Sequence, residues 1–308
     1  MKYKFTFSVI TPTYNRSHFL YRVYQSLYNQ TFQDFEWIVI NDGSTDNTDK
    51  IISQLIQDSS FYIQYIYQEN SGLHVARNKG VTMARGYLSV FLDDDDILTP
   101  FALERFWYWW NQIPPAQQDK FAGVTALCAD LITGEIIGDR FPRDVMVANN
   151  VQMFGVLRVR GDKARCFRTE ILRAYPWPTD IGRYVTAALV YNRISKSYLL
   201  LFVNEVLMLK QVGTTHPRIT HKKRQLLAKS PYASRLYFKE YLEHPLPLLE
   251  RTRALIHYIR YSFHANISLC KQIADSPYKL LYFPALPIGY LLYRKDVSLL
   301  KKLERMKH

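Results

Sequence analysis

Short apolar runs alternate with stretches of helical periodicity over the first hundred residues of the chain. The apolar runs are rich in β-branched and aromatic residues and cover residues 5–11, 36–41, 63–68 and 87–92. Between them, apolar residues recur at helical spacing over residues 17–30, 45–55 and 73–85. Strands that alternate with helices at this spacing predict an α/β fold, with a mostly parallel sheet, right-handed crossovers and helices on both faces.

The pattern changes after the sequence Ile113-Pro-Pro. Residues 124–130 and 135–137 have strand character and flank Thr133-Gly134, which predicts a hairpin in a mixed part of the sheet. Residues 183–194 then predict a helix, and residues 199–209 contain a further strand.

The last third of the chain differs from the rest in charge. Residues 206–308 hold 19 basic and 6 acidic side chains, a difference that equals the whole formal net charge of +13. The segment reads as helical from His221, with aromatic residues between the basic ones. Such a pattern fits an anionic membrane surface, and the alternatives are nucleic acid, a homodimer interface, or packing against the preceding domain.

Residues 280–293 favour the membrane surface over nucleic acid. The segment is strongly apolar, is interrupted by Pro284 and Pro287, and is followed by Arg294-Lys295. It is shorter than the roughly 20 residues that span a bilayer, so we expect an interfacial or re-entrant anchor.

Composition places the rest of the protein in the cytoplasm. The chain is 48% hydrophobic and 22% charged, as folded proteins are. Cys128, Cys166 and Cys270 show no ligand spacing and indicate thiols in a reducing compartment. The N-terminus has no signal-peptide pattern. We therefore expect a cytoplasmic protein that is peripheral at the inner face of the membrane.

Polar residues follow each of the first four predicted strands, and in a parallel sheet these strand ends share one edge. The last group, Asp93 to Asp96, consists of four adjacent carboxylates, which repel one another unless a cation lies among them. A divalent-metal site is one interpretation, and an acidic turn before a helix at Thr99-Pro100 is the other. Neither G-x-G-x-x-G nor a P-loop is present, so a dinucleotide or P-loop site is excluded.

Four motifs in this region resemble those of family-2 glycosyltransferases of the nucleotide-diphospho-sugar transferase (GT-A) fold. They are TPTYNR at 11–16, VINDGSTD at 39–46, QENSGLHVARNKG at 68–80 and FLDDDD at 91–96. The resemblance covers residues 7–100 and continues more weakly at 161–163, 167–168 and 204–205. It implies a GT-A domain over residues 1–215, with a nucleotide-binding half (1–100) and an acceptor half (101–215), before a helical tail at 216–308.

The resemblance also implies roles for individual residues. Asp42 and Arg77 would contact the nucleotide, Asp93 would face the sugar and ribose, and Asp95 would bind Mn²⁺ or Mg²⁺ between the two phosphates. The other residues assigned to the nucleotide-sugar site are Thr11, Tyr14 and Arg16, which would line the base pocket, and Asp94. The alternatives are surface ion pairs for both arginines and a helix cap for Asp42. For Asp94 and Asp96 they are a supporting place behind the residues that contact the ligand, or charges at a helix N-terminus.

A loop at residues 213–218 resembles one that closes over the nucleotide diphosphate. His216 would be a further metal or phosphate ligand there and Arg218 a phosphate contact, the alternative for His216 being a solvated side chain.

An inverting transfer needs a general base, usually a carboxylate. Alignment with the family puts Ala187 at that position, and alanine cannot accept a proton. Asp180 is the nearby acidic candidate. An alanine at this position is also compatible with a catalytically silent protein, an inactivated variant, or a local misalignment.

Together with these features, the resemblance implies an inverting, metal-dependent enzyme. It would transfer a sugar from a UDP-sugar to a hydroxyl of a glycan or lipid-linked acceptor, in cell-surface polysaccharide synthesis. The alternative is a silent nucleotide-binding homologue that acts as a partner subunit.

Overall fold

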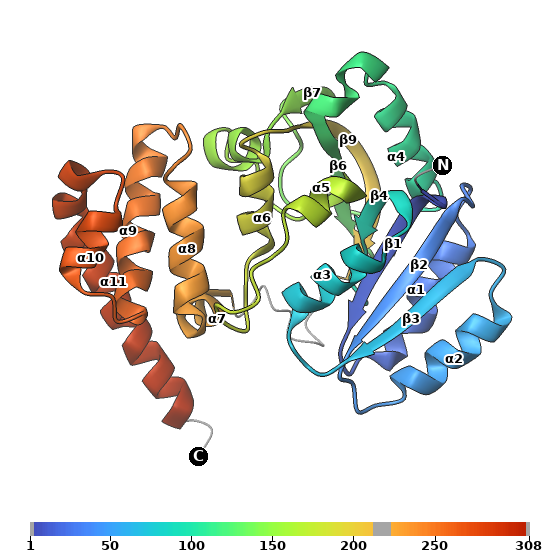
Figure 1. Cartoon of the computed structure of the whole chain (residues 1–308), viewed down its shortest axis with the longest axis horizontal. Coiled ribbons are helices and arrows are strands. Elements are labelled where there is room, and N and C mark those ends of the chain that lie inside the picture. The colour runs from blue at the N-terminus through green and yellow to red at the C-terminus, as the bar shows by residue number, and fades with distance from the viewer. Residues whose placement is uncertain (1–2, 212–222, 306–308) are drawn as a thin grey trace. The chain divides into compact units, whose positions relative to one another are not determined.

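The structure is a computed structural model that describes residues 3–211 and 223–305 (Figure 1). Its contacts divide the chain into two compact units. Unit 1 comprises residues 1–176 and 197–213, and unit 2 comprises residues 177–196 and 214–308. Our sequence-based boundary at residue 215 assigned residues 177–196 to the first domain. These residues pack instead with the C-terminal helices, because α6 (Ala187–Ile194) contacts α8 (Pro231–Tyr241).

The first part of unit 1 alternates strands and helices as expected, with bounds that differ from the expected ones by a few residues. Its elements are β1 (Phe5–Thr13), α1 (Ser17–Tyr28), β2 (Phe35–Asp42), α2 (Thr48–Asp58), β3 (Tyr62–Gln68), α3 (Leu73–Met83) and β4 (Gly86–Phe91). The second part contains β5 (Asp96–Leu98), α4 (Ala102–Asn111), η1 (Pro115–Lys120), β6 (Phe121–Asp130), β7 (Val145–Ala148), the π-helical turn η2 (Gln152–Val156), β8 (Lys163–Arg168), α5 (Thr169–Ala174) and β9 (Leu199–Lys210).

All of these strands belong to one sheet, with the order β3-β2-β1-β4-β8-β6-β9-β5 and β7 paired to β9. Strands β3, β2, β1 and β4 are parallel, with Ile10 opposite Ile38 and Val9 opposite Val90. The second half is mixed, since β8 is antiparallel to both β4 and β6 whereas β6 and β9 are parallel. The carboxyl ends of the first four strands therefore meet at one edge, as the βα pattern predicts.

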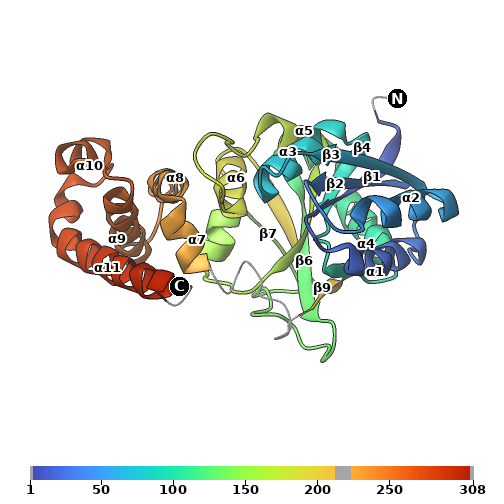
Figure 2. The same ribbon diagram turned by 90° about the horizontal axis from the view of Figure 1, so that it is seen from below.

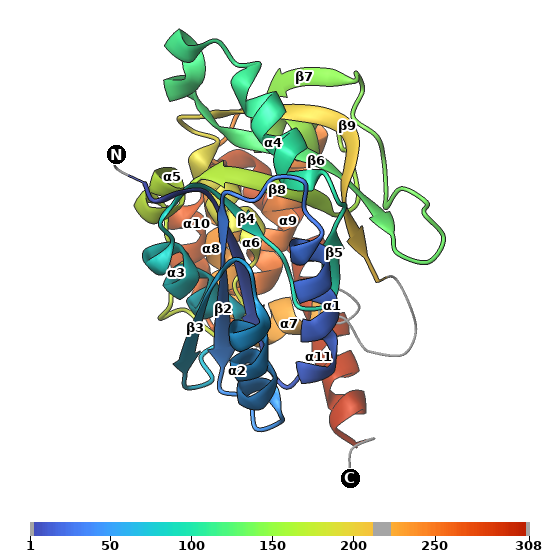
Figure 3. The same cartoon turned by 90° about the vertical axis from the view of Figure 1, so that its right-hand side faces the viewer.

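Helices cover both faces of this sheet (Figure 2). α1, α2 and α4 pack on one face, and α1 lies beside β5 (Figure 3). α3 packs on β1 and β2 from the other face, where α5 contacts β4 and β8.

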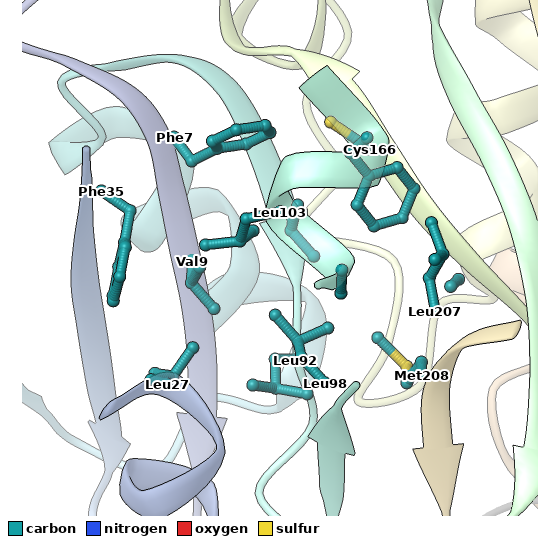
Figure 4. Close-up of a cluster of buried hydrophobic side chains, with 14 of the residues drawn as sticks. Phe7, Val9, Leu27, Phe35, Leu92, Leu98, Leu103, Cys166, Leu207 and Met208 are labelled. Atoms are coloured by element: carbon teal, nitrogen blue, oxygen red, sulfur yellow. The ribbon is translucent and has the colours of Figure 1, made fainter. Parts of the chain in front are cut away.

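The main core lies between the sheet and the helices α1 and α4. Phe7 and Val9 lie on the same face of β1 and point into this core. There they meet Leu27 of α1 and Leu103 of α4 (Figure 4). All four side chains are fully buried, so this cluster supplies the hydrophobic stabilisation that holds the strand edge in place.

The hairpin expected around Thr133-Gly134 is confirmed in a short form. The amide of Asp130 donates to the carbonyl of Glu135 at 2.8 Å, and Ala129 bridges Ile136. Gly134 has a φ of 72°, a conformation that glycine adopts without the cost that a side chain adds.

Unit 2 is helical in its described part. Its elements are α6, α7 (Lys223–Lys229), α8, α9 (Leu248–His264), α10 (Leu269–Asp275) and α11 (Lys279–Arg305). The expected break at Pro284 and Pro287 is wrong, because α11 runs through both prolines. Each proline removes one hydrogen bond to the carbonyl four residues earlier, which belongs to Leu280 or Phe283. Both of those residues are exposed, so water can hydrate the freed carbonyls while the opposite side of α11 packs on α9.

We predict that Gly80→Ala destabilises unit 1 by about 1–3 kcal/mol, the usual cost of adding a methyl group to a packed interior. A Cβ atom at this position in α3 would lie 2.4 Å from Cγ2 of Ile10 on β1. Urea denaturation measures the change, and Lys79→Ala, at the exposed neighbouring position, is the control. A Gly80→Ala protein as stable as the native chain would show that α3 and β1 separate more easily than this distance implies.

Candidate functional site

The carboxyl ends of β1, β2 and β4 carry the polar residues singled out in the sequence. Thr13 lies opposite Asn41 in the β1–β2 pair, and the amide of Leu92 donates to the carbonyl of Ile10 at 3.0 Å. The segments 14–16, 42–46 and 93–96 therefore emerge at the same edge of the sheet, and they are the basis of the site.

Asp42 lies at the end of β2 and holds the loop that leads into α3. Its Oδ1 accepts hydrogen bonds from Nε2 of Gln68 at 2.7 Å and from the amide of Ser71 at 2.9 Å. Its Oδ2 accepts from the amide of Gly72 at 2.9 Å and from Nδ2 of Asn70 at 3.3 Å. Each carboxylate oxygen thus already has two donors, and Asp42 fixes the start of α3.

His74 lies in the first turn of α3 and is buried. Burial lowers the pKa of its imidazole, although the nearby Asp42 carboxylate opposes this. Its Nε2 is buried without a hydrogen-bond partner among the described residues. The side chain is therefore a neutral group beside the Asp42 loop.

Arg77 lies one turn further along α3 and reaches the acidic cluster. Its Nη2 is 2.9 Å from Oδ1 of Asp93, and its guanidinium lies over the ring of Phe91, 5.3 Å from the centroid. Burial alone would raise the pKa of Asp93. The positive charges of Arg77 and Lys210 outweigh burial and lower the pKa.

Arg16 follows β1 and binds the next two carboxylates. Its Nη1 is 3.1 Å from Oδ1 of Asp94 and 2.8 Å from Oδ2 of Asp95. Burial raises the pKa of Asp94 to about 7, with a smaller contribution from the neighbouring Asp93 and Asp95, although Arg16 opposes the shift. Arg16 and Arg77 are thus ion-paired with the acidic segment, and their side chains are 27% and 13% exposed.

Lys210, at the end of β9, is a member of the site that the sequence analysis missed. Asp96 and Lys210 are opposite each other in the β5–β9 pair and form a buried ion pair. Nζ of Lys210 is also 3.9 Å from Oδ2 of Asp93. Burial lowers the pKa of Lys210, but Asp96 and Asp93 outweigh it and raise the pKa above its ordinary value. A lysine that ends an apolar strand needs an acidic partner, and that was the available signal.

Arg22 on α1 was also missed. Its Nη2 donates to the backbone carbonyl of Asp95 at 2.7 Å, and its Nη1 donates to Oε1 of Gln211 at 2.7 Å. It therefore fixes the backbone of the acidic segment without pairing with a carboxylate in these two contacts.

Two sequence-based interpretations need correction. The hydroxyl of Thr11 is fully buried and accepts a hydrogen bond from Nε1 of Trp37 at 2.9 Å, so this side chain belongs to the core and does not line a base pocket. The acidic segment does not begin a helix, because β5 follows it and α4 starts only at Ala102. Asp94 and Asp96 are therefore not charges at a helix N-terminus.

The remaining expected residues have varied positions. Tyr14 is exposed. Asp180 is exposed in the segment before α6, and Ala187 is the half-buried first residue of α6, both in unit 2. His216 and Arg218 lie outside the described residues.

The donor set fits a hard divalent cation only if the substrate completes it. In residues 3–211 and 223–305, no three His, Cys, Asp or Glu side chains are grouped as a metal site. Asp93 and Asp95 offer carboxylates whose side chains are 37% and 17% exposed. Mg²⁺ is commonly bound through one or two carboxylates together with substrate phosphates. The residues therefore fit an ion that arrives with a diphosphate.

We predict that Asp94→Asn removes a pH-dependent loss of stability. The pKa of Asp94 is about 7 in the folded protein, compared with about 3.9 in an unfolded chain, so the folded state holds more protons between these values. The free energy of unfolding from this group therefore falls as the pH rises, by up to about 1.4 kcal/mol per pH unit. Urea denaturation from pH 4 to pH 7 should show a shallower decline for the variant. Parallel curves for the two proteins would contradict the burial of this carboxyl group.

We predict that Lys210→Met destabilises unit 1 by about 3–5 kcal/mol at pH 7, because it leaves the buried Asp96 carboxylate without its counter-charge. The loss should be smaller at pH 5, where Asp96 can take up a proton. The matched control is Lys210→Met combined with Asp96→Asn, which removes both charges and should recover most of the stability in urea denaturation. Equal losses in the single and double variants would mean that lysine packing, rather than charge pairing, is responsible.

Comparisons with known proteins agree with this arrangement. The sequence model of the family described as "Glycosyl transferase family 2" matches residues 8–131. An uncharacterized glycosyltransferase of Nostoc sp. is 40% identical over 98 residues, which are 32% of this chain and 30% of that protein. A chondroitin synthase of Pasteurella multocida is 38% identical over 97 residues, which are 32% of this chain and 10% of the synthase. The matches thus span less than a third of these relatives.

Solved structures are similar over nearly the whole chain. S. aureus TarS 1–349 has a TM-score of 0.63 at 17% identity, covering 96% of this chain and 91% of the TarS chain. A mannosyltransferase of Pyrobaculum calidifontis, in complex with GDP-Man and Mn²⁺, has a TM-score of 0.58 at 19% identity and covers 99% of this chain and 83% of its own. At these identities the similarity establishes the fold alone, which is GT-A.

The helices were also compared with what a bilayer requires. Within the described residues, none is both long and apolar enough to cross a membrane.

The four motifs of the strand edge, the family match over the same residues and the shared GT-A fold lead to one assignment. Through residues 8–131 the chain resembles the members of glycosyltransferase family 2.

Proposed function

We propose that the chain transfers a sugar from a UDP-sugar to a hydroxyl group of a glycan or lipid-linked acceptor, in the synthesis of a cell-surface polysaccharide. The observation that carries this proposal is the strand edge at which Arg16 and Arg77 reach the carboxylates of residues 93–95, beside the Asp42 loop. Cations and carboxylates placed this closely can bind a nucleoside diphosphate together with a metal ion.

The comparisons support the uridine donor and the glycan product. TarS has been solved in complexes with UDP and with UDP-GlcNAc. Among the curated relatives are a chondroitin synthase and a hyaluronan synthase of Pasteurella multocida. The GDP-Man complex of the mannosyltransferase shows that the fold also accepts guanine nucleotides, so the uridine preference follows from the motif resemblance together with TarS.

The proposed reaction inverts the anomeric carbon. The acceptor hydroxyl attacks this carbon as the bond to the diphosphate oxygen breaks, and the hydroxyl proton passes to a general base. Arg16 and Arg77 would offer guanidinium groups to the negative charge that collects on the leaving diphosphate. Asp95 would hold Mn²⁺ or Mg²⁺, which would neutralise part of the same charge when bound, and Asp93 would face the sugar and ribose.

Donor binding is the first test. Calorimetric titration of UDP should show binding that requires Mn²⁺ or Mg²⁺ in the native chain and is weakened at least tenfold by Asp95→Asn, because the variant loses a metal ligand. Asp119→Asn, at an exposed position in η1, is the matched control and should bind as the native chain does. Tight binding without metal, or no binding in either condition, would overturn the proposal of a metal-dependent donor site.

The general base separates an active enzyme from a silent homologue. We propose Asp180 as the base, because it is exposed in the segment before α6 whereas Ala187 has no group that accepts a proton. Asp180→Asn should then lower kcat about 100-fold or more, the usual contribution of general base catalysis, with UDP affinity unchanged. Release of UDP from UDP-GlcNAc in the presence of acceptor measures this.

A silent partner subunit is the second candidate, and Ala187 is the observation that favours it. In that case the native chain and Asp180→Asn would be equally inactive while binding UDP, and Ala187→Glu would introduce turnover. Turnover by the native chain that is lost in Asp180→Asn excludes the silent role.

The basic C-terminal helices supply the proposed location. We propose that the protein lies at the inner face of the membrane, where a lipid-linked acceptor would be presented, and that anionic lipids attract the excess positive charge of residues 206–308. The rival partner for these helices is a second copy of the chain.

A further inference from the structure

Helix α11 has two opposite sides. On the buried side, Tyr282 and Ala285 face the interior of unit 2, and Gly289 lies so close to α9 that an added Cβ atom would be 2.6 Å from Cγ2 of Ile259. Asp296, on the same side, accepts hydrogen bonds from Arg260 at 2.5 and 2.6 Å and from Arg224 at 2.7 Å. This side fixes α11 against the rest of the unit (Figures 1 and 2).

The opposite side of α11 is exposed and apolar in its first half. Leu280, Phe283 and Leu291 are 90%, 59% and 60% exposed, and their spacing puts them on one stripe of the helix. The residues of this stripe, which we call the α11 face, are Leu280, Phe283, Pro284, Pro287, Ile288 and Leu291, and all of them are exposed. An unpartnered apolar stripe of this length marks an interaction surface.

Charge decides between the partners that this face could meet. Among the side chains described in α11, the basic ones are all exposed: Lys279, Arg294, Lys295, Lys301 and Lys302. Over the same residues, 279–302, the one acidic side chain is Asp296, which is buried and already ion-paired. Two copies that met through this face would bring like charges together, whereas anionic headgroups would complement them.

We propose that the α11 face inserts between the headgroups and acyl chains of an anionic membrane, with Arg294, Lys295, Lys301 and Lys302 at the phosphate level. A helix with an apolar stripe and basic flanks binds membranes in this way, parallel to the surface. The inference deepens the proposed membrane location and does not depend on sugar transfer.

The test is flotation of the full chain with vesicles of phosphatidylcholine alone or with about one third phosphatidylglycerol. We expect the native chain to bind the anionic vesicles at least tenfold more strongly, and binding to weaken as salt is raised. Leu280→Ser combined with Phe283→Ser and Leu291→Ser should reduce binding at least tenfold. The matched control combines Leu248→Ser, Leu249→Ser and Leu269→Ser, three exposed leucines of α9 and α10 in the same unit, and should bind as the native chain does.

A charge variant tests the second half of the helix. Replacing Arg294, Lys295, Lys301 and Lys302 with Gln should remove the preference for anionic vesicles, and circular dichroism should show that the helices remain folded. The proposal is overturned if the native chain binds both vesicle types equally or not at all. It is also overturned if light scattering shows a dimer that the triple serine variant dissociates, since the face would then join two copies.

UDP titration of the same protein samples separates this inference from the proposed function. Loss of vesicle binding with intact UDP binding in the serine variant supports the inference. Vesicle binding by a chain that does not bind UDP would overturn the donor site alone.

Discussion

Four adjacent carboxylates can be held at one strand end only if positive charge is brought to them, and the fold of unit 1 brings that charge from three directions. Arg16 comes from the end of β1, Arg77 from α3 and Lys210 from the end of β9. Asp96 and Lys210 form a buried ion pair, whereas the side chains of Asp93 and Asp95 remain partly exposed to solvent. The site thus combines a buried, neutralised ion pair with accessible carboxylate oxygens, which suits a ligand that carries both phosphate and metal.

The elements around this cluster are fixed by uncharged parts of the structure. The core between β1, α1 and α4 sets the position of the strand ends, and the close approach of Gly80 to Ile10 sets the distance of α3 from the sheet. Asp42 then fixes the first turn of α3 through two backbone amides. Because α3 is held both at its first turn and at Gly80, Arg77 between these two points can reach Asp93.

Unit 2 uses charge in a different way. Its buried Asp296 is paired with Arg260 and Arg224, and the basic side chains described in α11 are all exposed. These basic side chains share one side of the helix with the apolar stripe that begins at Leu280. An apolar half and a basic half thus follow each other along α11, whereas residues 1–205 carry no net charge.

The sequence by itself determined the α/β order of unit 1, the shared strand edge and the resemblance to glycosyltransferase family 2. Local periodicity and four ungapped motifs carry that information, and both depend on residues close together in the chain. It also named Arg16, Arg77 and Asp93 to Asp95 as members of one site. Only the tertiary structure decided that Lys210 joins them from a distant strand and that Thr11 turns into the core toward Trp37. The same holds for the continuity of α11 through its prolines and the packing of residues 177–196 with the C-terminal helices. These features depend on contacts between residues far apart in the chain, and the energy of those contacts outweighs local preference.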